Sequence, residues 1–278
     1  MSAIDPKLKA YLDALVDELE QPAFIPDDPI AIPHGFDDPR DQEVIGLYVA
    51  LLAWGRRATI MSKTAELCER MRYRPYAFVK GFDAEDAGRL AGFKHRTFQP
   101  EDAFWLTRCL SALLNEFGSI EQVFARYMGS GDPHVGPGIE GFATTLLHAV
   151  PSVPDRLAKH VARPSTGSAC KRINMYLRWM VRPGPVDLGL WTHIGTGQLL
   201  LPLDVHSGRT ARALGLLKRP VNDWRATLEL SEVCRVMCPE DPARYDYAFF
   251  GSGASGRPLD SRFVATGNAA VTTLPRPR

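Results

Sequence analysis

The sequence contains no run of apolar residues long enough to cross a bilayer, and its first residues show no signal-peptide pattern. Cysteine is scarce: five cysteines at unrelated spacings exclude a disulfide framework and indicate reduced thiols in the cytoplasm. No second ligand pair accompanies Cys234 and Cys238, so we expect no metal site. The sequence also lacks period-two alternation bounded by hairpin turns, which argues against β-sheet.

The net charge is only +1, but the charged residues are unevenly distributed. Residues 1–46 contain 11 acidic and 3 basic side chains, so residues 47–278 carry a net charge of +9. An acidic N-terminal segment beside a basic body is weak support for a polyanionic partner. Scattered solvated charges explain the same distribution equally well.

Apolar residues recur at helical spacing along most of the chain. We therefore predict an all-α fold, with an irregular connection through the prolines of 21–40 and a flexible tail over 251–278. The predicted helices cover 5–20, 42–55, 58–72, 101–117, 119–129, 138–149, 152–162, 169–182, 222–237 and 241–250.

Lys171 follows RPSTGSAC, a turn between two predicted helices. Such a hairpin can direct backbone N–H groups and a helix N-terminus at a phosphate. Residues 163–182 contain five basic side chains and no acidic one, which suits a nucleic-acid backbone. A solvated basic helix face is the alternative.

Asp204 precedes the helical stretch HSGRTARALG and is well placed to be its N-cap. Capping also keeps a carboxylate ionised, through the helix dipole and the hydrogen bonds that it accepts. A fixed anion near a neutral amine suits chemistry at an anomeric carbon: the carboxylate stabilises positive charge on the sugar while the amine attacks.

Two motifs resemble the helix–hairpin–helix (HhH-GPD) DNA glycosylase superfamily. PLDVHSGRTARALGL (202–216) is similar to its aspartate-bearing motif, and the hairpin before Lys171 is similar to the lysine-bearing hairpin of its bifunctional members. The long gap between the two is most similar to that of archaeal 8-oxoguanine glycosylases. Across about residues 25–253, the set AWGRR, GFKHRTF, NMYLRWMVR, DLGLW, PLDVHSGR and YDYAFFG resembles the DUF2400 family.

The resemblance implies a domain organisation. After an N-terminal helix (1–24), residues 25–250 would form a glycosylase-like helical domain of two subdomains, with the active site between them. Lys171 would be the nucleophile at the sugar C1′, and Asp204 the activating and stabilising carboxylate. No iron–sulfur cluster is expected, because the cluster cysteines of the endonuclease III branch are missing.

The resemblance also implies where DNA and the damaged base would bind. Asp246 and Phe250 would line the base pocket, by accepting from the Watson–Crick edge and by stacking. The residues of 55–57 would face the unpaired partner base, and those of 93–96 would supply a wedge and an intercalating cation. The implied DNA contacts are Arg56, Arg57, Phe93, Lys94, His95, Arg96, Gly167, Arg172, His206 and Arg209.

Purely structural roles for some of these residues stay open. Arg56 and Arg57 would also suit the exposed carbonyls at a helix end, and Phe250 would also suit the core. Trp54, Trp179 and Trp191 are interpreted as core residues.

The sequence therefore favours a DNA glycosylase with AP lyase activity that excises an oxidised purine, 8-oxoguanine first, from double-stranded DNA. It would need no metal or organic cofactor, because the lysine and the aspartate carry the steps. We expect a monomer without membrane association, in the cytoplasm at the nucleoid. Two alternatives stay open: a non-catalytic protein that binds lesions or structured DNA on the same fold, and a helical protein with no DNA role.

Overall fold

The computed structural model describes residues 4–129 and 131–264, and within these ranges the regular elements are all helices. Isolated β-bridges occur there, but no strand forms. The all-α prediction is therefore confirmed for the described chain. The α-helices are α1 (Pro6–Leu19), α2 (Ala31–His34), α3 (Pro39–Leu52), α4 (Arg57–Arg70), α5 (Pro75–Lys80), α6 (Ala84–Leu90), α7 (Pro100–Phe117), α8 (Ile120–Ala125), α9 (Gly136–Leu147), α10 (Lys171–Val181), α11 (Val205–Ala213), α12 (Trp224–Met237) and α13 (Ser252–Ser255).

Shorter helical turns connect these helices. The 3-10 helices are η1 (Pro22–Asp27), η2 (Asp155–Lys159), η3 (Pro164–Thr166), η4 (Thr196–Gln198) and η5 (Pro242–Tyr245), and η6 (Tyr247–Gly251) is a π-helix.

Proline and aspartate define where α1 and α3 begin. Pro6 and Pro39 occupy the first helical position, where the missing N–H has no intrahelical partner to lose. Asp5 and Asp38 precede them, and each side chain accepts a hydrogen bond of 2.9 Å from the backbone N–H two residues along. These are local signals, so helix starts of this kind can be identified in the sequence.

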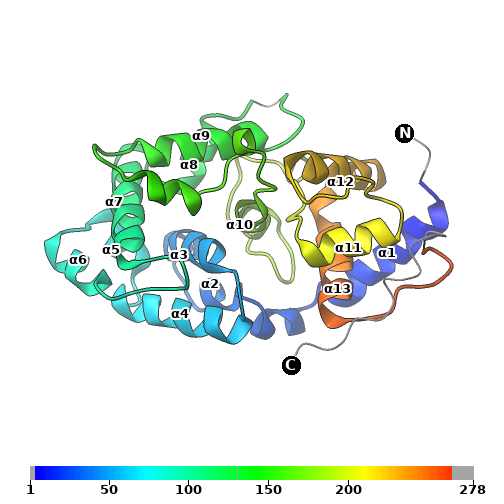
Figure 1. Ribbon diagram of the computed structural model, residues 1–278, viewed down its shortest axis with the longest axis horizontal. Helices are drawn as coiled ribbons and strands as arrows, with labels where there is room; N and C mark the ends of the chain where they lie inside the picture. The colour runs from blue at the N-terminus through cyan, green and yellow to red at the C-terminus, as the bar shows by residue number, and fades with distance from the viewer. Residues whose placement is uncertain (1–3, 130, 265–278) are drawn as a thin grey trace.

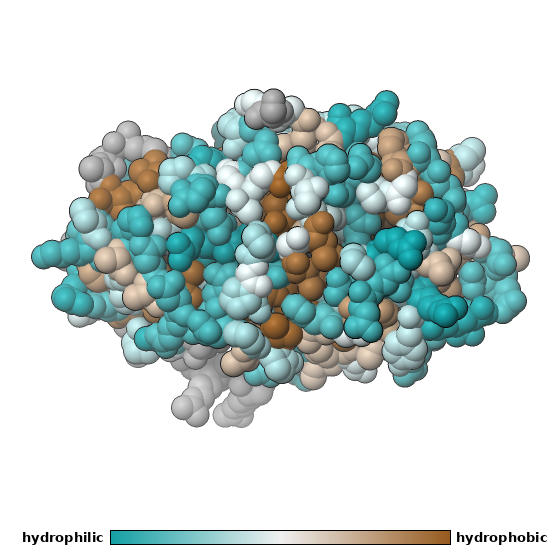
Figure 2. Space-filling model, turned by 180° about the vertical axis from the view of Figure 1, so that it is seen from behind, coloured by the Kyte–Doolittle hydropathy of each residue, from teal (hydrophilic) through white to brown (hydrophobic). Residues whose placement is uncertain are grey.

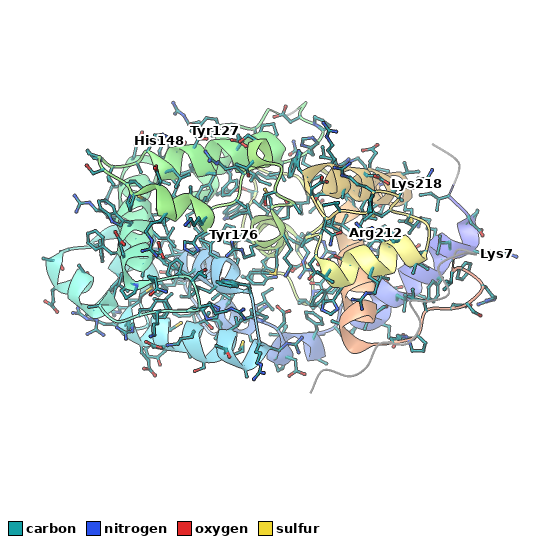
Figure 3. The ribbon with its side chains drawn as sticks, in the orientation of Figure 1. Lys7, Tyr127, His148, Tyr176, Arg212 and Lys218 are labelled. Carbon is teal, nitrogen blue, oxygen red and sulfur yellow. The ribbon has the colours of Figure 1, made fainter. Side chains whose placement is uncertain are left out.

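Helices α3 and α10 pack against each other near the centre of the molecule (Figure 1). Residues 173–181 of α10 are all buried. Gly46 of α3 permits the close approach, because a Cβ atom there would lie 2.8 Å from Met180 Cε. The Tyr176 hydroxyl, at the centre of Figure 3, donates to Glu43 O of α3 at 3.1 Å. The core therefore holds α10 in a defined position.

The buried apolar residues form two clusters. The larger cluster is built mainly on α3, α4, α7, α8, α9 and α10, and the smaller one on α1, α11, α12 and residues near Tyr245. Figure 1 shows the elements of the smaller cluster together on the right, beside α10. Helix α1 thus packs with the C-terminal part of the chain, although the sequence analysis set residues 1–24 apart.

Several segments differ from their predicted structure. Residues 21–40 contain η1 and α2 where an irregular connection was expected, and 152–162 contain only the short η2. The predicted helix 241–250 is split into η5 and η6. Helices α5 and α6 were not predicted, because six or seven residues are too few to show a helical period.

The predicted flexible tail begins as ordered structure. Residues 252–255 form α13, and the Phe263 ring stacks on Tyr11 of α1 with ring centroids 5.2 Å apart. Leu259 packs against the same cluster. Residues 252–263 thus include a helical turn and pack against α1, and residues 265–278 lie outside the described chain.

Hydrophilic side chains cover most of the face shown in Figure 2, and a narrow apolar stripe runs near its middle. None of the described helices is both long and apolar enough to cross a membrane. All five cysteines are free and buried.

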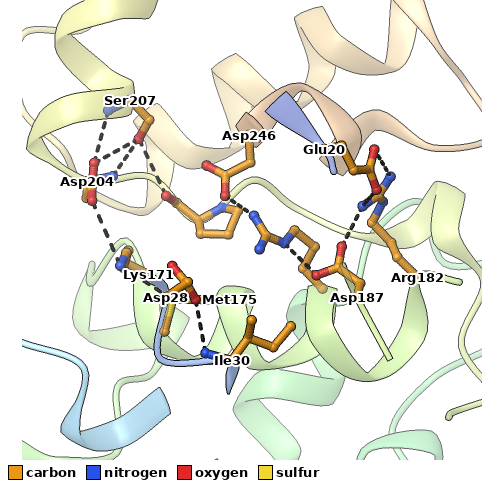
Figure 4. Close-up of polar contacts among 12 residues, drawn as sticks. Glu20, Asp28, Ile30, Lys171, Met175, Arg182, Asp187, Asp204, Ser207 and Asp246 are labelled. Carbon is orange, nitrogen blue, oxygen red and sulfur yellow. Dashed lines mark hydrogen bonds and ion pairs between the residues drawn. The ribbon is translucent and has the colours of Figure 1, made fainter. Parts of the chain in front are cut away.

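Arg178 of α10 and Arg182, which follows it, connect the clusters through buried ion pairs (Figure 4). Arg178 pairs with Asp246, and its Nε lies 3.2 Å from the carboxylate of Asp187. Arg182 Nη1 lies 2.5 Å from Asp187 and 2.9 Å from Glu20, which follows α1. Because each buried charge faces a partner, attraction offsets the cost of desolvation.

Asp187→Ala tests how much this network contributes to stability. Asp187 is 3% exposed, and its loss leaves two buried guanidinium groups without a shared partner. We expect the free energy of unfolding to fall by about 3–5 kcal/mol in urea denaturation. Glu85→Ala, which removes an exposed partner of Arg72, should cost less than about 1 kcal/mol. Equal losses in the two variants would contradict the importance of the network.

Candidate active site

Lys171 is the first residue of α10, so its position depends on the turn before that helix. Gly167 and Cys170 both have left-handed backbone, with φ of 76° and 50°, and they redirect the chain after η3. The Cys170 N–H donates to Ser168 Oγ at 3.2 Å. The Gly167 carbonyl accepts from Trp224 N at 3.0 Å, which ties the turn to α12. The lysine therefore stands, half-buried, at the start of a firmly held helix.

Asp204 caps α11 with one of its two oxygens. Oδ1 accepts from the backbone N–H of His206 at 2.8 Å and of Ser207 at 3.0 Å. The Ser207 hydroxyl also contacts Oδ1, and it accepts from the Asp204 N–H at 2.9 Å to complete a capping box. Oδ2 faces the other way and lies 3.8 Å from Lys171 Nζ (Figure 4). The capping and ion-pair interpretations of Asp204 are thus compatible.

Lys171 and Asp204 line a cavity of about 730 Å³, a volume within the ~300–1,000 Å³ range of small-molecule sites. Its other walls come from segments far apart in the sequence. They include three aromatic side chains and two further carboxylates: Phe24, Trp54, Phe250, Asp28 and Asp246.

The amino group of Lys171 has few polar neighbours. Nζ lies 3.5 Å from Met175 Sδ and 5.8 Å from the centre of the Phe250 ring. Asp204 is its one ion-pair partner among the described residues. The remaining hydrogen-bonding directions of the amine are therefore open to a molecule in the cavity.

Asp246 is 4% exposed and pairs with Arg178 through Oδ2. Its Oδ1 is buried and has no hydrogen-bond partner among the described residues. Burial raises the pKa of Asp246 to about 6, and the Arg178 guanidinium opposes that rise. A carboxylate with one oxygen held and one oxygen unpaired is suited to accept from a ligand.

Asp28 is a cavity carboxylate that the sequence analysis did not identify. It is 8% exposed, and its carboxylate accepts one hydrogen bond within the described chain, from the Ile30 N–H to Oδ1 at 3.1 Å. Burial raises its pKa. Asp28 lies in the proline-rich segment that was expected on the surface. The apolar Ile30, two residues later, was the one sign in the sequence that this segment is buried.

The predicted DNA-binding segments 55–57 and 93–96 meet at one edge of the cavity. The Arg96 guanidinium lies 4.7 Å from the Trp54 ring centre, and a Cβ at Gly55 would lie 2.4 Å from Arg96 Nη1. Gly55 also has φ of 103°, a backbone conformation that favours glycine. Arg57 lines the cavity, and Trp54, expected in the core, is half-buried against it.

Two predicted DNA contacts are buried inside the protein and a third is half-buried in the cavity wall, which corrects their placement. Phe93 is fully buried against Phe98, so it cannot act as a surface wedge in this structure. His95 is 1% exposed, with Nε2 3.1 Å from Trp54 O. Arg172 lines the cavity, but its guanidinium donates to a backbone carbonyl of α3. Core packing occupies Phe93 and His95, and a backbone carbonyl occupies the Arg172 guanidinium.

The other predicted contacts reach the surface. Arg56, Lys94 and Gly167 are exposed, and Arg209 is partly exposed on α11. His206 is exposed at the cavity edge, and its ring is T-shaped to Phe250 with centroids 6.0 Å apart.

The fold and the site define a helical protein with a lysine–carboxylate pair in a cavity between two hydrophobic clusters. A family model described as "Protein of unknown function (DUF2400)" matches residues 28–255, and the chain belongs to this family. The match contains Lys171, Asp204 and every cavity residue except Phe24. No curated protein and no solved structure matches the chain. Nor do the described residues hold a cluster of His, Cys, Asp and Glu able to bind a metal ion.

Two substitutions separate the capping role of Asp204 from its charge. Asp204→Ala removes the acceptor at the start of α11 and should lower the free energy of unfolding by about 1 kcal/mol. Asp204→Asn keeps a capping oxygen and should remain within a few tenths of a kcal/mol of the wild type. Chemical denaturation measures both; a large loss for Asn would mean that the charge itself stabilises the fold.

The ionisation of Asp246 should make stability depend on pH. Its pKa is about 6 in the folded protein, above the ordinary 3.8. A raised pKa contributes stability that is fully present below about pH 4 and is lost as the pH rises through about 6. The unfolding free energy of the wild type minus that of Asp246→Asn should therefore fall between pH 4 and 6 in denaturant titrations. A rise over this range would show that Arg178 dominates over burial.

Proposed function

We propose that this protein is a DNA glycosylase with AP lyase activity that removes an oxidised purine, 8-oxoguanine first, from duplex DNA. The observation that carries the proposal is the 3.8 Å approach of Lys171 Nζ to Asp204 Oδ2 inside a cavity large enough for a base. The two residues come from motifs that resemble the lysine and aspartate motifs of helix–hairpin–helix glycosylases.

The local architecture is consistent with that superfamily. A short helix, η3, leads through a tight turn at Gly167 into α10, with the lysine at the helix start. The aspartate caps a helix of the other hydrophobic cluster, so the cavity lies at the junction of two helical bodies. We infer from these features a glycosylase-like fold of two subdomains with the active site between them.

The proposed chemistry needs no group beyond this pair. Lys171, after losing a proton, attacks C1′ with its lone pair; the C1′–N bond breaks, and its electron pair leaves with the base, which takes up a proton. Asp204 Oδ2 faces the positive charge that develops on the sugar. Ring opening then yields a protonated Schiff base, and loss of a C2′ proton expels the 3′-phosphate.

The cavity walls suit a purine. Phe24, Trp54 and Phe250 offer aromatic surface, and Phe250 also lies beside the lysine. The unpaired Oδ1 of Asp246 can accept from the N–H groups on the Watson–Crick edge of a guanine derivative. A flipped base held in this way would present its C1′ to Lys171.

Exposed cations at one edge of the cavity supply a DNA-binding surface. Arg56, Arg57 and Lys94 are exposed and have no carboxylate partner within the described chain, unlike exposed arginines such as Arg72. Arg96 lies over Trp54 beside them. Unpaired cations of this kind bind phosphates with release of counterions, and Arg is also suited to an unpaired base.

Borohydride trapping tests the proposal. Duplexes carrying 8-oxoguanine, uracil, thymine glycol or an abasic site are incubated with the protein and reduced. We expect a covalent adduct with the wild type and none with Lys171→Gln, because reduction captures only a Schiff base. Asp204→Asn should lower the rate of base release by about 100-fold or more, since its fold is kept while the anion is lost.

Lys218→Gln is the matched control, because Lys218 is an exposed lysine after α11, at the right of Figure 3, away from α10. It should trap as well as the wild type. Binding that persists without adduct or base release on any duplex would favour the non-catalytic DNA-binding alternative. Absence of salt-dependent affinity for duplex DNA would overturn any DNA role.

A further inference from the structure

Asp28 forms no salt bridge within the described chain. It is more than nine-tenths buried, yet only the Ile30 N–H donates to its carboxylate there, and that bond goes to Oδ1. An asparagine or serine would satisfy the same backbone N–H. The second carboxylate oxygen has no hydrogen-bond donor within the described chain, and Asp28 lines the cavity, which points to a ligand there that supplies the donor.

The cavity thus presents two separate carboxylates of similar character. Asp28 follows η1 on the N-terminal side, and Asp246 precedes the π-helix η6 near the end of the described chain. Both line the cavity that holds Lys171 (Figure 4). Each has one carboxylate oxygen that accepts no hydrogen bond from the residues that the structure describes. An ionised carboxylate only accepts hydrogen bonds, so a ligand that satisfies both must donate at two places.

Purines differ in where they donate. Guanine donates from N1 and N2 on its Watson–Crick edge, while N7 and O6 on its other edge only accept. Oxidation at C8 converts N7 into an N–H donor, so an 8-oxoguanine donates from both edges. The lone pair on N7 of unmodified guanine would instead face a carboxylate and be repelled.

Resting on the proposed function, we propose that Asp28 is a specificity-determining residue that accepts a hydrogen bond from N7–H of an 8-oxopurine, while Asp246 accepts from the Watson–Crick edge. Asp28 takes no part in bond breaking in this assignment. Its carboxylate attracts the N7–H group of the oxidised base and repels the N7 lone pair of guanine, and this difference selects the oxidised base.

Asp28→Asn tests the assignment, because it preserves an oxygen for Ile30 and replaces the acceptor with an amide donor. Single-turnover base release is measured on duplexes carrying 8-oxoguanine or 8-oxo-7-deazaguanine, in which a C–H replaces N7–H. The wild type should release 8-oxoguanine faster. Asp28→Asn should slow that release by about 10- to 100-fold and bring the two rates together.

Two controls separate base selection from folding and catalysis. Asp27→Asn, at the exposed neighbouring position, should behave as the wild type. Trapping of Asp28→Asn on an abasic-site duplex should also match the wild type, because no base is present to be selected.

Any other result would overturn either the role of Asp28 or the proposed function. If Asp28→Asn releases 8-oxoguanine as fast as the wild type, Asp28 does not select the base. The same follows if the variant loses abasic-site trapping as much as it loses base release. Either result would overturn the role of Asp28 and leave the proposed function standing. A wild type that neither traps nor releases any base would overturn the proposed function, and this assignment with it.

Discussion

The ion pairs of Arg178 and Arg182 are the interaction on which the geometry of the cavity depends. Arg178 lies in α10, the helix that begins at Lys171, and Arg182 directly follows it; their partners Asp246 and Glu20 directly precede the π-helix and follow α1, respectively. Apolar contacts are non-directional, whereas guanidinium–carboxylate pairs have defined geometry. The network therefore sets how the cluster carrying Asp204 lies against α10, and with it the distance from Nζ to Oδ2.

The cavity carboxylates share one pattern. Asp204 uses Oδ1 for the cap of α11, Asp246 uses Oδ2 for Arg178, and Asp28 uses Oδ1 for a backbone N–H. The second oxygen of Asp204 faces the lysine. The second oxygens of Asp246 and Asp28 accept no hydrogen bond from the described residues. A side chain anchored by one oxygen has already lost its rotamer freedom, so the other oxygen meets a ligand without further ordering. This arrangement suits both catalysis and selection of a base.

Local signals account for the helices that were predicted well. In α1 an aspartate cap, a following proline and a long apolar stripe coincide. The same cap and proline begin α3, whose start was predicted three residues late, at 42. The structure departs from the predictions where distant contacts decide. The segment 241–250 changes from 3-10 to π-helix as it passes Asp246, the partner of Arg178, and residues 251–264 are held by α1. Neither contact partner is close in sequence.

The sequence by itself determined the helical class and the cap at Asp204, because these depend on periodicity and on neighbours within a few residues. Only the tertiary structure decided that Lys171 and Asp204 meet. It also placed Asp28 in the cavity and Phe93 in the core. The physical reason is that burial and pairing arise from packing between segments far apart in the chain, on which composition and spacing place no limit.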